Sequence, residues 1–547
     1  MVGQSSLWKA QLAIIGGGVG GFAAAWAALR RGLTVVMTEE YDRVGGQFTS
    51  QAVPPDEHPW IENFGCSASY RQFRQLVRAY YKEWYPLSPR ALQFWETLNP
   101  GQGFVSSLCH EPAVSRAVME SLLRPYLSSG QLKLLLHTVP VGATRVGDRL
   151  LEVEVEERLE DGEKRHYRLQ APYFIEATET GDLLPLAEVE YRIGSESRQE
   201  TGEPHAPLEP DPHNQQAISW CMILDYQPER EARLEPPAQY DFWRQYVPQL
   251  TPPWSGPLLS WTATHPITLE PVERSFDPLH PQPERGPMDL WTFRRLAWRE
   301  NFEYPAGTSE LVLVNWPQID YLEGNIVEVT PQEKARHLEG ARQLSLSLLY
   351  WMQTEAPRPD GGKGWPGLGL RPDVAQTADG LARAPYVREA RRLKGLFTVY
   401  EQHVSLECRC QETGLSPQEV RATQFSDSVG IGAYRLDLHP TTRGQNYLDV
   451  SALPFQIPLG SLLAADTVNL LAGGKTLSVT HITNGCYRLH PVEWGVGEAA
   501  ALCVAYALER GVNPHQIYAQ PAHLEDLQND LSARGLELEW PQEIYPL

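Results

Sequence analysis

The chain has 547 residues, 42% of them apolar and 21% charged, and a formal net charge of −21 at pH 7. The composition is that of a globular protein. The chain is too long for one hydrophobic core, so at least two domains are expected. The negative charge argues against nucleic acid and anionic membranes as partners, and no apolar run is long enough to span a bilayer.

The cysteines and the first residues indicate the compartment. Seven cysteines are scattered along the chain, and the close pair Cys408 and Cys410 lacks further ligands at metal-site spacing. The first residues, MVGQSSLWKAQ, contain no apolar signal-peptide core. We therefore expect reduced thiols, no metal site, no integral membrane segment and a cytoplasmic location.

A glycine-rich turn follows the first apolar run of the chain. Residues 12–15 predict a short buried strand, and residues 22–31, rich in Ala and Leu, predict a helix. The turn between them has the spacing G-x-G-x-x-G, which lets backbone approach a pyrophosphate at the helix N-terminus. The residues expected at the nucleotide are Gly16, Gly18, Val19 and Gly21.

A second apolar run, residues 33–37, predicts the next strand, and Glu39 stands at its end. Its distance from the glycines suits a carboxylate that accepts hydrogen bonds from ribose hydroxyls. A glycine-rich turn alone would be weak evidence for a nucleotide. Together with the flanking strands, the helix and the acidic residue, it predicts a dinucleotide-binding unit.

The middle of the chain predicts mixed elements. Amphipathic helices are expected at 70–83 and 111–127, a strand at 132–136, a charged hairpin at 150–169 and an apolar strand that ends at Thr178. Residues 195–290 are rich in Pro, Trp and His and predict an irregular but ordered cap. A long helix is expected after Thr330, with Pro331 as its first residue and Glu333 completing a capping box.

The C-terminal part predicts a strand at 468–472, a loop, and a helix at about 492–509. The loop carries three side chains suited to proton transfer or anion binding: His481, Arg488 and His490.

Beyond Glu39 the sequence reads YDRVGGQFTSQ, in which Arg43, Gly45 and Gly46 match an R-x-G-G signature. The chain resembles FAD-dependent oxidoreductases of the two-dinucleotide-binding-domain class. The other segments that carry this resemblance are IIGGGVGGFAAAWAALRRG, FIEATETGDLLPLAEVEY, PYVREARRLKG, FSDSVGIGAYRLDLHP and NLLAGGKTLSVTHITNGCYRLHPVEWGVGEAA. The resemblance extends distantly to the flavoproteins of fumarate reductase and succinate dehydrogenase. The sequence contains no second unit of strand, G-x-G-x-x-G turn and helix, so a separate NAD(P)H domain is not expected.

The resemblance implies an α/β fold: a Rossmann-like FAD-binding domain of the glutathione-reductase type with an inserted α+β substrate or cap domain. The implied boundaries are 1–194 for the N-terminal FAD part, with a β-meander at about 132–178, then 195–455 for the cap and 456–547 for the C-terminal FAD part. Further FAD contacts are implied at Glu40, Arg43, Gly45, Gly46, Gln47, Val139, Thr178, Gly181, Asp182, Gly474, Val496 and Gly497.

Covalent attachment of FAD is not expected. The related fumarate reductases often tether the cofactor through a histidine in the loop after the second strand, and this loop reads GGQFTSQAV, without histidine. FAD is therefore expected to be non-covalent.

The implied function is hydride transfer between a polar small molecule and flavin N5, by a dehydrogenase or oxidase. Alternatives are a reductase or isomerase of an activated C=C bond and a non-catalytic FAD-binding assembly or regulatory protein. The electron acceptor and the oligomeric state stay open. The candidate catalytic residues, each also compatible with a structural role, are His490, Arg488, His481, His439 and Arg388.

Two further expectations concern the substrate. If residues 388–392 are helical, Arg388 shares a face with Arg391 and Arg392, which would bind an anion or neighbouring glutamates. Tryptophans of the middle domain are expected to line the pocket or to pack in its core: Trp220, Trp261, Trp291, Trp316 and Trp351.

Overall fold

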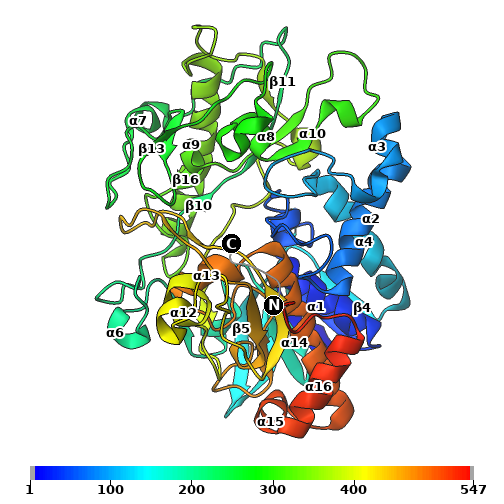
Figure 1. Cartoon of the computed structure of the whole chain (residues 1–547). Coiled ribbons are helices and arrows are strands. Elements are labelled where there is room, and N and C mark those ends of the chain that lie inside the picture. Colours follow the sequence, from blue (N-terminus) through cyan, green and yellow to red (C-terminus); the bar gives the residue numbers. More distant parts are fainter. Residues whose placement is uncertain (1–5, 160, 542–547) are drawn as a thin grey trace.

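A parallel sheet of five short strands lies in the lower half of the molecule in the computed structural model, which describes residues 6–159 and 161–541 (Figure 1). The strand order is β23-β8-β2-β3-β4, and four of the five strands are buried along their whole length, as expected for a parallel sheet covered on both faces. The predicted α/β class is confirmed. The strands are β2 (Leu12–Ile15), β3 (Val35–Thr38), β4 (Leu132–Leu135), β8 (Tyr173–Glu176) and β23 (Leu470–Ala472).

Two helices from opposite ends of the chain pack against each other beside this sheet. They are α1 (Val19–Arg30) and α14 (His490–Arg510), blue and orange in Figure 1. Their backbones nearly touch, because a Cβ atom on Gly497 would lie 2.0 Å from the carbonyl oxygen of Gly20. The C-terminal segment is therefore part of the same layer as the first glycine-rich turn.

A second sheet, in the order β1-β7-β6-β5, contains the predicted hairpin. The hairpin strands β6 (Arg149–Arg158) and β7 (Lys164–Gln170) pair antiparallel, and β1 (Ser6–Lys9) joins β7 in parallel. β5 (Thr138–Val146) leads from the parallel sheet into this one.

The middle of the chain forms the upper, green part of Figure 1 around the sheet β14-β15-β11-β17. The long helix α9 (Pro331–Thr354) begins as predicted: the Thr330 hydroxyl caps Glu333 N–H, and the Glu333 carboxylate accepts from Thr330 N–H. Short strands and many loops surround it, in agreement with the expected irregular cap. The sheet strands are β11 (Met222–Tyr226), β14 (Arg295–Ala297), β15 (Leu311–Val314) and β17 (Leu368–Leu370).

The remaining elements are short or peripheral. The predicted helices at 70–83 and 111–127 are α2 (Ala68–Trp84) and α4 (Pro112–Ser129). The other helices are α3 (Pro89–Gln93), α5 (Leu183–Leu186), α6 (Arg198–Thr201), α7 (Tyr240–Gln245), α8 (Leu290–Phe293), α10 (Pro372–Ala375), α11 (Glu401–Val404), α12 (Leu406–Thr413), α13 (His481–Tyr487), α15 (Pro514–Ala519) and α16 (Pro521–Ala533). The other strands are β9 (Tyr191–Arg192), β10 (Ile218–Ser219), β12 (Thr262–Thr264), β13 (Pro271–Glu273), β16 (Asp320–Tyr321), β18 (Arg392–Leu393), β19 (Ser428–Gly432), β20 (Leu436–Leu438), β21 (Leu448–Val450) and β22 (Phe455–Pro458).

Two expectations about local structure are wrong. The predicted loop before the last long helix contains α13, which Thr480 caps through its hydroxyl, and α14 already begins at His490. Residues 387–391 are not helical; the following β18 pairs with β9. Pairing with a distant strand here overrides the local helix preference.

None of the helices within the described residues has the length and apolar character needed to cross a bilayer.

Candidate cofactor and substrate site

The first glycine turn provides a cradle of bare backbone at the end of β2. Gly16 has φ +104°, and a Cβ there would lie 2.2 Å from the carbonyl oxygen of Ala177, so only glycine fits. Helix α1 starts at Val19 with its first turn buried, without a side-chain cap and without an acidic residue. Such a helix end has free N–H groups and a positive dipole end, which suit a phosphate.

A narrow groove runs from this cradle along the ends of the parallel strands. Glu39 stands in it, and its carboxylate accepts hydrogen bonds from the N–H groups of Gly17 and Tyr41, both at 3.0 Å. Burial raises the pKa of Glu39 to about 8. The groove brings together seven of the residues predicted from sequence to contact FAD: Gly16, Gly18, Glu39, Glu40, Val139, Thr178 and Asp182.

The second glycine pair lies directly beside the first turn. Gly45 N–H donates to the carbonyl oxygen of Gly17 at 2.7 Å, and both Gly45 and Gly46 have positive φ. Arg43 uses its guanidinium elsewhere: it pairs with Asp42 at 2.9 Å and donates to carbonyl oxygens of residues 375 and 376. Gly181, another predicted contact, has φ +70° and packs against Arg391.

Buried polar atoms without partners gather in the loop that follows. Among the described residues, no hydrogen bond is made by Gln47 Oε1, Ser50 Oγ or either amide atom of Gln51. Gln47 Nε2, in contrast, donates to the carbonyl oxygen of Arg488 at 3.0 Å and to the Glu493 carboxylate. Because buried polar atoms are nearly always hydrogen-bonded, these atoms suit hydrogen bonds to a polar ligand or to water, and Gln47 is in contact with the start of α14.

The start of α14 supplies the opposite wall. His490 is fully buried, accepts the Asp56 N–H on Nδ1 at 3.2 Å, and packs against Phe48 with ring centroids 4.6 Å apart and the rings tilted by 58°. Burial lowers the pKa of His490 to about 4. Gly474 packs against Glu493, Val496 is buried, and Gly497 meets Gly20, so the last three predicted residues lie at this helix and its contacts.

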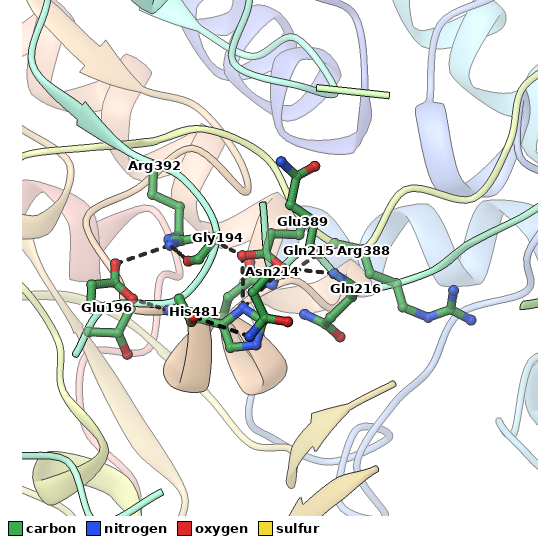
Figure 2. A network of polar contacts seen from close by, with 12 residues as sticks. Gly194, Glu196, Asn214, Gln215, Gln216, Arg388, Glu389, Arg392 and His481 are labelled. Atoms are coloured by element: carbon green, nitrogen blue, oxygen red, sulfur yellow. Dashed lines mark hydrogen bonds and ion pairs between the residues drawn. The ribbon is translucent and has the colours of Figure 1, made fainter. Parts of the chain in front are cut away.

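His481 belongs to a separate buried network (Figure 2). Its Nδ1 lies 2.9 Å from Glu389 Oε1, Glu389 pairs with Arg392 at 2.6 Å, and Arg392 pairs with Glu196 at 3.0 Å. Burial would raise the pKa of Glu389, but His481 and Arg392 outweigh it and hold it at about 2. Figure 2 shows Arg388 directed away from this network. Through this network His481 connects α13 to the segments that contain Glu389 and Glu196.

A second network joins His439 and Arg388 through Asp320. His439 Nδ1 lies 2.6 Å from Asp320 Oδ2, and Arg388 Nη2 lies 3.1 Å from Asp320 Oδ1. Ser219 donates to the same carboxylate at 2.6 Å. Burial would raise the pKa of Asp320, but Arg388 and His439 lower it below its ordinary value, so the carboxylate is held ionised. Sequence reasoning missed Asp320, which has no motif around it.

His439 faces a cavity of about 510 Å³. Its ring lies 5.4 Å from that of Tyr447, and its Nε2 lies 4.0 Å from Asp437 Oδ2. Asp437, which lines the cavity, in turn pairs with the buried Arg488 at 3.4 Å. The lining segments come from residues 57–59, 265–267, 287–294 and 434–449, far apart in the sequence.

Of the two roles expected for the five tryptophans, the structure shows packing in or against the core, and none of them is among the residues that line this cavity. Trp291 and Trp316 are 1% exposed and pack around Phe276, and Trp261 packs on Trp351. Trp220 is also in the core. Apolar contact of the cavity comes instead from Phe293, Met288, Ile267 and prolines.

Comparison with known proteins identifies a family. A family model described as FAD dependent oxidoreductase matches residues 11–531. No curated protein matches the sequence.

Several solved structures are similar in part. L-proline dehydrogenase from P. horikoshii is 18% identical with a TM-score of 0.17, over 35% of this chain and 25% of that one. Glycerol-3-phosphate dehydrogenase from Bacillus halodurans, complexed with FAD, is 13% identical with a TM-score of 0.24, over 42% of each chain. OxyS anhydrotetracycline hydroxylase from Streptomyces rimosus is 11% identical with a TM-score of 0.31, over 96% of this chain and 66% of that one. The chain spans less than half the length of the first two, and likeness at this level carries no argument about the reaction.

Proposed function

Because the chain belongs to the FAD dependent oxidoreductase family and is an FAD-dependent oxidoreductase, we propose that it transfers a hydride between a polar small molecule and the flavin, as a dehydrogenase or oxidase. The observation that carries this proposal is the His439–Asp320 pair on the wall of the cavity of about 510 Å³. When bound, FAD supplies a two-electron acceptor that takes hydride at N5.

The described residues fit FAD. The buried, uncapped start of α1 suits the pyrophosphate, and the groove at Glu39 suits the adenosine ribose. The unpartnered polar atoms of Gln47, Ser50 and Gln51 suit the polar edge of a flavin ring. These are the residues that we assign to holding the cofactor.

The proton that accompanies the hydride needs an acceptor, and His439 suits that role. Asp320 Oδ2 accepts from the Nδ1–H of His439, which leaves the Nε2 lone pair free to take a proton from the substrate. Asp320 and Asp437, on the two sides of the ring, then stabilise the imidazolium. Arg388 pairs with the other carboxylate oxygen of Asp320, and this ion pair keeps the carboxylate charged and in place.

His490 and Arg488 take different parts in this proposal. His490 has its pKa lowered to about 4 by burial, so it stays neutral near pH 7 and is a weak proton acceptor. With Nδ1 used by Asp56 N–H and Nε2 unpartnered among the described residues, it suits a polar contact to the cofactor. Arg488 holds Asp437 at the cavity wall.

Anaerobic reduction of the bound flavin tests the proposal. Fractionated metabolite pools are added to the oxidised holoprotein, and the loss of its visible flavin absorbance is followed. We expect one fraction to bleach the flavin and to yield a product lighter by two hydrogens. If instead only the pre-reduced protein reacts, and it saturates an activated C=C bond, the direction of transfer proposed here is wrong.

The mode of FAD attachment gives a separate prediction. The loop of residues 46–53 contains no histidine or cysteine, so acid precipitation is expected to release all of the flavin into the supernatant. Absorbance of the supernatant and of the washed pellet measures the partition. Colour that stays with the pellet and with a peptide after digestion would contradict non-covalent binding.

A further inference from the structure

One arginine at the cavity, Arg274, forms no ion pair with any acidic residue in the described part of the chain. Arg274 follows β13, its side chain is nine-tenths buried, and it lines the cavity that His439 faces. Its Nη1 donates to the carbonyl oxygen of Pro287 at 2.8 Å, while its buried Nε makes no hydrogen bond within the described residues. Burial lowers the pKa of Arg274, opposed by the nearby Tyr447. A buried cation is costly unless an anion meets it.

The acidic side chains that line the cavity already form ion pairs with other arginines. Each carboxylate that lines the cavity pairs with an arginine other than Arg274, and so do Asp56 and Asp320. The pairs among the described residues are Asp56 with Arg294, Glu57 with Arg74, Asp320 with Arg388, Asp437 with Arg488, and Asp449 with Arg435. Asp289, which pairs with Ser275 next to Arg274, accepts backbone N–H groups instead, so Arg274 forms no ion pair among the described residues.

Arg274 lines the same cavity as His439, the proposed proton acceptor. Tyr447 also lines this cavity, and its ring lies 5.4 Å from that of His439. Asn315 Oδ1, in the same cavity, is buried without a hydrogen-bond partner among the described residues. A ligand held at Arg274 would thus occupy the cavity that His439 also lines.

We propose that Arg274 binds the carboxylate of the substrate, which is an organic acid with an apolar body. The inference rests on the function proposed above and names its substrate class. A guanidinium matches a carboxylate with two parallel hydrogen bonds. No lysine is among the residues that line the cavity in the described chain, and Asp437 and Asp449 stand in its wall, which disfavours a doubly charged phosphate. Phe293, Met288 and Ile267 suit the apolar body.

Binding to the oxidised holoprotein tests this without turnover. The probes are 3-phenylpropanoate, its neutral amide 3-phenylpropanamide, and phenyl phosphate, each followed by calorimetry and by the flavin absorption spectrum. Since a hydrogen bond to a charged group contributes about 1.5–3 kcal/mol, we expect the parent to prefer the carboxylate over the amide by at least about tenfold. Arg274→Met should abolish that preference, and Arg274→Lys should keep part of it.

Arg285→Met is the matched control, because Arg285 lies on the neighbouring segment, is exposed and is not part of the cavity wall. It should retain the full preference. Without ligand, Arg274→Met should melt at or above the parent temperature, since a buried unpaired charge is removed.

Three results would overturn the proposal: equal affinity of the parent for acid and amide, an undiminished preference in Arg274→Met, or tighter binding of phenyl phosphate than of the carboxylate. Flavin reduction is measured in separate samples. Intact carboxylate binding in a protein whose flavin no metabolite reduces would therefore contradict the proposed reaction while leaving Arg274 as an anion site.

Discussion

The His439→Ala variant is expected to reduce its flavin about 100- to 10,000-fold more slowly than the parent with the same substrate, because it loses its general base. Its FAD content and melting temperature should change little, since the histidine is on the cavity wall and partly exposed. The measurement is the anaerobic rate of flavin reduction per bound FAD. His439→Gln, which keeps a polar group beside Asp320, should be as slow as alanine, because it cannot take a proton.

The comparison variant is His481→Ala. His481 is buried in the ion network of Glu389 and Arg392, so its loss should lower the melting temperature but leave the rate per bound flavin unchanged. Asp320→Asn tests the positioning role: it should slow flavin reduction at unchanged FAD content, because His439 loses the carboxylate that accepts its Nδ1–H. A parent-like rate in His439→Ala with full FAD content would remove His439 from the mechanism.

The Gly497→Ala variant is expected to lose about 3 kcal/mol or more of folding stability, the upper end of the range for overpacking a core. Its new Cβ would lie 2.0 Å from the carbonyl oxygen of Gly20, so α14 would have to move away from α1. That shift would also open the site where both helices begin. Thermal melting and FAD retention on gel filtration measure the effect.

Gly495→Ala is the matched control on the same helix. Its nearest neighbour would be a side-chain atom of Ile457 at 3.8 Å, an ordinary contact. Alanine is the better helix former by up to about 1 kcal/mol, so this variant should melt at or above the parent temperature. Equal melting of the two alanine variants would contradict the close helix contact described here.

The nucleotide half of the site could be predicted because its signals are local. Strand, glycine turn, helix and Glu39 lie within thirty residues, and each obeys a short-range rule of backbone geometry or helix formation. The same holds for the capping box of Thr330 and Glu333, which the structure contains as predicted. In such cases the neighbours along the chain are also the neighbours in space.

The substrate half could not be predicted in the same way. Asp320 and His439 are 119 residues apart, and no pattern around Asp320 marks it as the partner of a histidine. Arg274 is recognisable only after the acids around the cavity are seen to be paired. The helix expected around Arg388 fails for a related reason, because the chain there is held extended beside residues 191–192 and 219. Contacts between residues that are distant in the sequence determine the structure at these positions. Such contacts produce no pattern in the neighbouring sequence.

The order of strands in the parallel sheet has a consequence for biosynthesis. β23 pairs with β8, although about 294 residues separate Glu176 from Leu470. At roughly 5–20 residues per second, a ribosome needs about 15–60 s to make that interval. During this time the edge of β8 lacks its neighbour and α1 lacks its cover, so the nascent chain offers an open edge to other chains. The side of the proposed cofactor site that α14 forms is therefore completed only after the C-terminal segment is synthesised.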